Sequence, residues 1–117
     1  MQDNRIMEMR EREAPPTLEE LRTVRDAILH AASHHHATNV RVFGSVAQGK
    51  ATARSDVDFL VDVAPECGGW EFFGVLDDLR QDLEALLGRR VDVVSIRGPA
   101  PDARDMAAEI ERDALPL

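Results

Sequence analysis

Hydrophobic residues recur at helical spacing in three stretches of the chain. The first begins at the capping box of Thr17 and Glu20 and runs to about Ser33, with apolar positions at Leu18, Leu21, Val24, Ile28 and Leu29. The second begins near Trp70 and ends at Gly88, with a stripe of Phe72, Phe73, Leu76, Leu79, Leu83, Leu86 and Leu87. The third begins at the predicted cap Asp102, after a loop at 98–101. It has Met106, Ile110 and Ala114 on one face. We therefore predict three helices.

Three shorter stretches have the pattern of strands. Residues 39–43 are β-prone and stop at Gly44, and residues 91–95 form another apolar run. Residues 56–63 alternate strictly, with Val57, Phe59, Val61 and Val63 on one face and Asp56, Asp58, Leu60 and Asp62 on the other. Helices thus alternate with strands, which predicts an α+β (α/β-like) fold with helices against a small sheet.

The length of 117 residues and the 44% of hydrophobic residues indicate one domain. We assign it to residues 17–117, preceded by a mobile, charged arm at 1–16 that ends in two prolines. No apolar run has the length of a membrane span or a secretion signal, and the single Cys67 cannot form an internal disulfide. We therefore expect no membrane partner and a cytoplasmic location.

The net charge of −8, without any basic run, disfavours a free nucleic-acid substrate. Solubility alone can also explain an acidic composition. The run His34-His35-His36 could bind a metal, but it is better interpreted as a solvated turn, because adjacent side chains in a loop face different ways.

Asp56 and Asp58 form the informative pair among the acids. Residues two apart on a strand point the same way, so two carboxylates come close together and need a cation such as Mg²⁺, which prefers oxygen ligands. Asp92 lies between two valines in the third strand, and it joins this pair if the two strands are neighbours. Three such carboxylates can hold two metal ions about 4 Å apart. The alternatives are a solvated strand face and an edge-strand acid that discourages aggregation.

Gly44 and Ser45 form a turn directly after the first strand. Glycine allows the backbone to approach an oxyanion, and the serine hydroxyl can donate to it, which is typical of phosphate binding. The turn is neither a P-loop nor a dinucleotide fingerprint. Lys50 and Arg54 could also meet phosphate oxygens, but isolated basic residues are more often surface charges, and we leave them outside the predicted site.

Together these motifs resemble the minimal nucleotidyltransferase (MNT) family, distant relatives of DNA polymerase beta. The resemblance runs from about Thr17 to the C-terminus and is carried by residues 43–45, Gly49, residues 55–61 and 90–94, and the closing segment 110–117. It implies a polymerase beta-like fold with a mixed sheet flanked by helices. It also implies that Gly44 and Ser45 cradle the triphosphate of ATP, that Asp56 and Asp58 ligate two Mg²⁺ ions, and that Asp92 completes the catalytic metal site.

The resemblance further implies an antitoxin of a HEPN/MNT toxin–antitoxin system that transfers AMP from ATP to a tyrosine of a HEPN-type ribonuclease toxin. We expect no second domain that could hold an acceptor, so the acceptor should come from elsewhere. The chain contains no tyrosine and cannot modify a tyrosine of its own, although modification of its own serine or threonine remains open. Two alternatives remain open. The chain could neutralise its partner by occlusion without catalysis, or it could transfer to RNA or to a small molecule, the latter in a pocket closed by a second copy of the chain.

Overall fold

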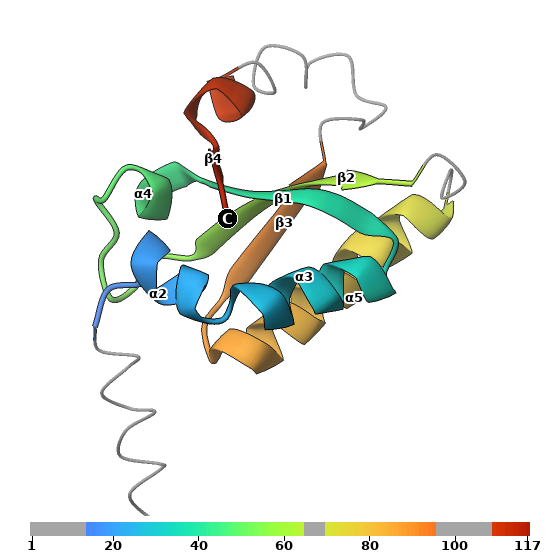
Figure 1. Ribbon diagram of the computed structural model, residues 1–117, viewed down its shortest axis with the longest axis horizontal. Coiled ribbons are helices and arrows are strands. Elements are labelled where there is room, and N and C mark those ends of the chain that lie inside the picture. Colours follow the sequence, from blue (N-terminus) through green and yellow to red (C-terminus); the bar gives the residue numbers. More distant parts are fainter. Residues whose placement is uncertain (1–13, 65–69, 96–108) are drawn as a thin grey trace, which may run out of the picture.

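Four strands form a single mixed sheet in the order β3-β2-β1-β4 (Figure 1). The computed structural model describes residues 14–64, 70–95 and 109–117. β1 (Ala37–Phe43) is antiparallel to β2 (Val57–Val63) and to β4 (Leu115–Pro116), whereas β2 is parallel to β3 (Val91–Ser95). The predicted α+β class with a mixed sheet and flanking helices is therefore confirmed.

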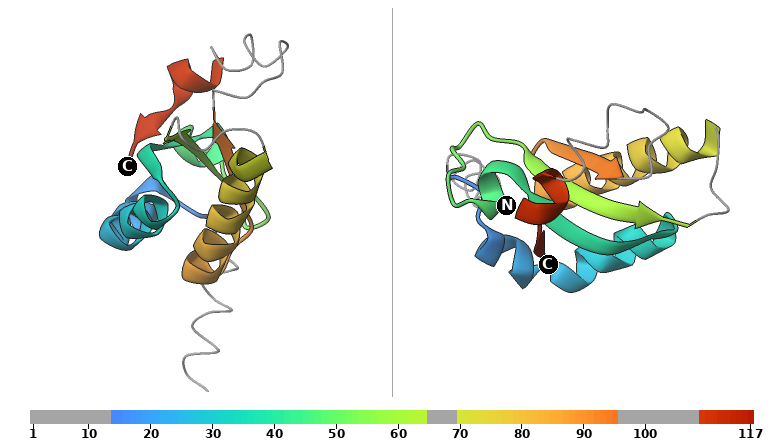
Figure 2. Two further views of the ribbon diagram at one scale, coloured as in Figure 1. Left: turned by 90° about the vertical axis from the view of Figure 1, so that its right-hand side faces the viewer. Right: turned by 90° about the horizontal axis from the view of Figure 1, so that it is seen from above.

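The two longest helices cover one face of the sheet. α3 (Arg25–His34) contacts β1, α5 (Trp70–Leu87) contacts β3, and the two helices contact each other on the same side of the sheet (Figure 2). Phe59, Ile28, Leu79 and Leu83 are at most 1% exposed in the core between these layers. Burying each of these side chains contributes about 1.5–3 kcal/mol, which holds the sheet and the helices together.

The first predicted helix is broken in two, and this part of the prediction was wrong. Thr17 caps α2 (Leu18–Thr23) as expected, through a 3.0 Å hydrogen bond from the Glu20 amide to its hydroxyl. Val24 then leaves the helical conformation with φ −113° and ψ 23°, and α3 follows. The Thr23 hydroxyl donates to the Glu20 carbonyl at 2.6 Å, a competing bond of the kind that bends helices.

Two other predictions, one about α5 and one about the N-terminal arm, differ from the structure. Leu86 belongs to the predicted apolar stripe of α5, yet it is 42% exposed, and the buried positions are Leu79 and Leu83. The arm predicted at 1–16 is docked at its end, because Pro16 is buried and the Ala14 carbonyl accepts a 2.7 Å hydrogen bond from Arg89.

Several predictions concern residues before α5 and in the last predicted helix, and the structure does not describe these residues. The following predicted residues and side chains lie outside the described ones: Cys67, the loop at 98–101, Asp102, Met106, and the side chains of Trp70, Phe72 and Phe73. Helical structure is present at 109–113, which includes Ile110.

The sequence did not predict β4. Its two residues pair with Arg41 and Val42, and Arg22 donates to the carbonyls of Pro116 and Leu117 at 3.0 and 3.3 Å. Proline lacks an amide hydrogen, so it is tolerated in this position at the edge of the sheet. The strand ties the C-terminal residues to β1, which leads directly into Gly44.

Candidate active site

The predicted site residues meet at one end of the sheet. β1 ends at this end, and β2 and β3 begin there, because β2 runs antiparallel to β1 and parallel to β3. The topology therefore brings Gly44 and Ser45, which follow β1, close to the acids at the start of β2 and β3. We call Asp56, Asp58 and Asp92 the acid cluster.

Asp58 and Asp92 are direct neighbours in the parallel register of β2 and β3. Their flanking residues Val57 and Val91 are buried in the core, so the two carboxylates project from the opposite face of the sheet. Burial and, to a smaller extent, the charges of Asp92 and Asp56 together raise the pKa of Asp58 from 3.8 to about 6. The neighbouring negative charges therefore disfavour the ionised form of Asp58.

Asp56 lies immediately before β2 and is held by a cation. Its Oδ1 is 3.1 Å from Nε of Arg90, the residue immediately before β3. The amide of Val57 donates to the Arg90 carbonyl at 3.0 Å, which continues the strand pairing to this point. Sequence reasoning did not identify Arg90. Arg90 precedes Asp92 by two residues, as Asp56 precedes Asp58, and this spacing places the two opposite each other once the register of β2 and β3 is known.

Gly44 is in contact with the acid cluster. Its φ is +71°, and a Cβ atom at this position would lie 2.3 Å from Oδ2 of Asp58. Only glycine permits both this conformation and this approach. Ser45 is half-buried in the short helix α4 (Gly44–Ala47), and its carbonyl accepts a 2.9 Å hydrogen bond from the Lys50 amide. α4 thus begins directly at Gly44, where β1 ends.

Asp62 shares the acidic face of β2 but is separate from the cluster. Arg41 donates to its Oδ1 at 3.1 Å, and Asn39 donates to its Oδ2 at 3.0 Å. Its charge is therefore balanced within the sheet. By contrast, neither Asp58 nor Asp92 forms an ion pair with any residue in the ranges that the structure describes.

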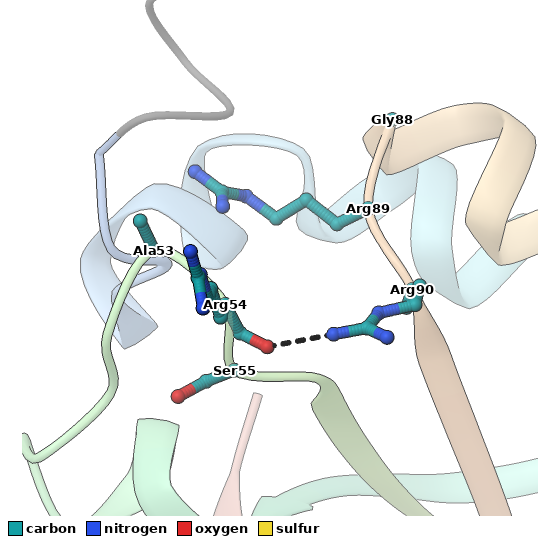
Figure 3. A pocket seen from close by; sticks show the side chains of 6 residues that line it. All are labelled: Ala53, Arg54, Ser55, Gly88, Arg89 and Arg90. Atoms are coloured by element: carbon teal, nitrogen blue, oxygen red, sulfur yellow. Dashed lines mark hydrogen bonds between the residues drawn. The ribbon is translucent and has the colours of Figure 1, made fainter.

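The histidine run, Arg54 and Lys50 were considered in the sequence but left outside the predicted site. His34 ends α3, and Nε2 of His35 is 2.5 Å from Asp82 of α5, so the histidine run is not the fully solvated turn that we predicted. Arg54 lines a pocket of about 200 Å³ together with Ala53, Ser55, Gly88, Arg89 and Arg90 (Figure 3). Lys50 is exposed.

The donor set of the acid cluster fits a hard divalent cation. Carboxylate oxygens are the ligands that Mg²⁺ prefers, and a cation would relieve the repulsion between Asp58 and Asp92. Across the described ranges, no three His, Cys, Asp or Glu side chains converge as a ready-made metal-binding group. A metal ion shared by Asp56 and Asp58 would have to compete with Arg90 for the Asp56 carboxylate.

Residues 21–116, which include every residue of this site, match the family described as "Nucleotidyltransferase domain". The chain belongs to this family. It is 41% identical over 81 residues to the protein adenylyltransferase MntA of Thermococcus cleftensis, and the match covers 67% of this chain and 76% of that protein. A solved structure assigned to a minimal nucleotidyltransferase is 42% identical, with a TM-score of 0.71, and the match covers 87% of this chain and 97% of that one.

The comparisons confirm the predicted family, the fold and the class of enzyme, a nucleotidyltransferase. Within the described ranges, no helix is both long and apolar enough to span a membrane.

Proposed function

We propose that this nucleotidyltransferase transfers AMP from ATP to a hydroxyl group of a partner protein. The observation that carries the proposal is the pairing of Asp58 with Asp92 beside Gly44, because two uncompensated carboxylates next to a close backbone turn suit a metal-bound nucleotide. The similarity to a protein named protein adenylyltransferase supports the choice of AMP and of a protein acceptor.

The proposed reaction is a displacement at the α-phosphorus of ATP. The acceptor oxygen forms a bond to the α-phosphorus, the bond to the bridging oxygen of the β-phosphate breaks, and pyrophosphate leaves. Asp56, Asp58 and Asp92 would hold two Mg²⁺ ions, which stabilise the charge on the attacking and leaving oxygens when they are bound. Asp92, which is exposed to solvent, takes the proton of the acceptor hydroxyl, while Gly44 and Ser45 cradle the triphosphate.

We propose a tyrosine of a cognate HEPN-type toxin as the acceptor, which makes the chain an antitoxin of the cytoplasm. The chain contains no tyrosine, so a tyrosine acceptor must lie on another protein. The MntA relative supports a partner protein as the acceptor, because its name specifies a protein substrate.

The direct test is labelling with α-labelled ATP, Mg²⁺ and the partner protein. The wild-type chain should label the partner, and Asp58→Ala and Asp92→Ala should reduce labelling by at least about a hundredfold, as expected for the loss of a metal ligand. Asp62→Ala is the matched control, because it removes an acid from the same face of β2 but outside the cluster. Equal labelling by Asp58→Ala and Asp62→Ala would disprove the proposed site.

A non-catalytic antitoxin that occludes its partner is the second candidate. Leu86 on α5 and Leu115 in β4 are 42% and 38% exposed, and both could contact a partner. The Asp56→Ala variant separates the two functions in a neutralisation assay in cells. An occluding antitoxin still protects the cells, whereas an enzymatic one does not.

A further inference from the structure

The acidic face of the sheet has two rows of side chains where β2 and β3 begin. Asp58 faces Asp92 in the second row, and Asp56 faces Arg90 in the row before it, since the register of the two strands continues backward by two residues. One row therefore holds two like charges, and the other holds an ion pair. Arg90 is the only described cation that pairs with a member of the acid cluster.

Three contacts fix Arg90 at this position. Its Nε lies 3.1 Å from Oδ1 of Asp56, its Nη2 donates to the Arg54 carbonyl at 2.9 Å (Figure 3), and its own carbonyl accepts from Val57 at 3.0 Å. The backbone is thus held by the sheet. The side chain is 73% exposed, and that of Asp56 is 49% exposed, so the ion pair can exchange partners without repacking the core.

The neighbouring arginines have different roles. Arg89 is only 7% exposed, donates to the Ala14 carbonyl, and lies 3.9 Å from Glu20. It therefore attaches the segment before α2 to the end of α5. Arg54 contributes its carbonyl to Arg90. Arg90 is accordingly the residue through which the pocket lined by Arg54, Arg89 and Arg90 connects to the acid cluster.

We propose that Arg90 is a positioning residue that acts as the counter-ion of Asp56 and is displaced from it when a divalent cation binds. The inference rests on the metal site of the proposed function. A metal shared by Asp56 and Asp58 must compete with the guanidinium for the Asp56 carboxylate. Because exposed ion pairs are weak, this competition lowers the metal affinity by up to about fivefold.

The test uses Mn²⁺ alone as the probe, with calorimetry or the paramagnetic resonance signal of free Mn²⁺ as the readout. Arg90→Met and Arg90→Gln should each lower the dissociation constant for Mn²⁺ by roughly two- to fivefold, because the competing charge is lost. Arg90→Lys should stay close to the wild type, since it retains the charge. Measuring two neutral variants protects the test against the misfolding of one of them, and thermal melting identifies the folded variants.

Arg41→Met is the matched control. It removes another cross-strand arginine with a 3.1 Å contact to an aspartate of the same face, but that aspartate is Asp62. Asp62 lies about 13 Å along the strand from Asp58, beyond the screening length of about 8 Å, so the Mn²⁺ affinity should not change. An unchanged or weaker Mn²⁺ affinity in the folded neutral variants overturns the proposal, as does a wild-type chain that binds no Mn²⁺.

The labelling assay keeps this inference separate from the proposed function. If the Arg90 variants bind Mn²⁺ more tightly but no partner is labelled, the proposed transfer fails and the counter-ion role of Arg90 stands. If the partner is labelled but the Mn²⁺ affinity does not respond to the charge at position 90, the counter-ion role fails and the transfer stands.

Discussion

Gly44 and Gly49 have the same positive φ but different surroundings, and this makes them a matched pair for mutation. Both have φ +71°. A Cβ atom on Gly49 would meet nothing within 4 Å, whereas one on Gly44 would lie 2.3 Å from Oδ2 of Asp58. An alanine in this left-handed conformation costs about 1–2 kcal/mol at either position. Only the alanine at position 44 also displaces a carboxylate of the acid cluster.

The size of that displacement follows from the contact distance. An ordinary contact between a methyl group and an oxygen is no shorter than about 3.4 Å, so Asp58 must move by about 1 Å. Asp58 has little room on its other side, because Asp92 lies next to it in the register. A misplacement of about 1 Å in a catalytic arrangement can reduce the rate by about a hundredfold.

We therefore expect Gly44→Ala and Gly49→Ala to lose similar stability, about 1–2 kcal/mol each, in urea unfolding followed by circular dichroism. In the labelling assay, Gly44→Ala should lose about a hundredfold in rate, and Gly49→Ala should remain within a few fold of the wild type. The reasoning is refuted if the two folded variants label the partner at similar rates. It is also refuted if Gly49→Ala loses activity as severely as Gly44→Ala, because the backbone strain alone would then explain the effect.

Three further predictions concern the acid cluster and the first helix. The pKa of Asp58 is raised to about 6 in the folded chain, so its ionisation destabilises the fold above that pH and has no effect below about pH 4. Asp58→Asn should therefore stabilise the metal-free protein by about 1 kcal/mol at pH 7, after allowance for solvent screening, and the gain should vanish near pH 4; a gain that persists at pH 4 would contradict this origin. Asp92→Asn should lower the pKa of Asp58 in an NMR titration, because the charge of Asp92 is one of the causes of the shift. Thr17→Ala should cost about 0.5–2 kcal/mol in urea unfolding through the loss of the cap to Glu20, and an unchanged midpoint would show that this hydrogen bond contributes nothing.

The regular patterns of the sequence predicted most of the fold. The alternation of residues 56–63 gave the second strand to within one residue, and the strand at Val91–Ser95 was predicted with its observed bounds. The sequence also predicted that α5 ends at Gly88, and the φ of +66° at this glycine agrees with that prediction. These elements are long or strictly periodic, so local preference and burial agree in them.

The remaining features depend on contacts between distant residues. The break at Val24 interrupts a continuous helical pattern and shows no breaker residue, and β4 has only two residues, one of them a proline. In the site, Gly44, Asp58 and Asp92 were predicted from their local motifs, and their proximity required that β2 pair with both β1 and β3. The pairing of Arg90 with Asp56 required the register of the two strands, which no local pattern contains.

The parallel pairing of β2 with β3 links the acid cluster to the folding of the whole chain. Parallel strands need a long crossover, and here α5 lies between the two strands in the chain, so Asp58 meets Asp92 only when this crossover brings β3 beside β2. The like charges of Asp58 and Asp92 oppose this pairing. A cation that binds only the completed cluster must therefore stabilise the native state by mass action, in proportion to the logarithm of its concentration. Cellular Mg²⁺ would then act on the abundance of the folded protein as well as on its chemistry.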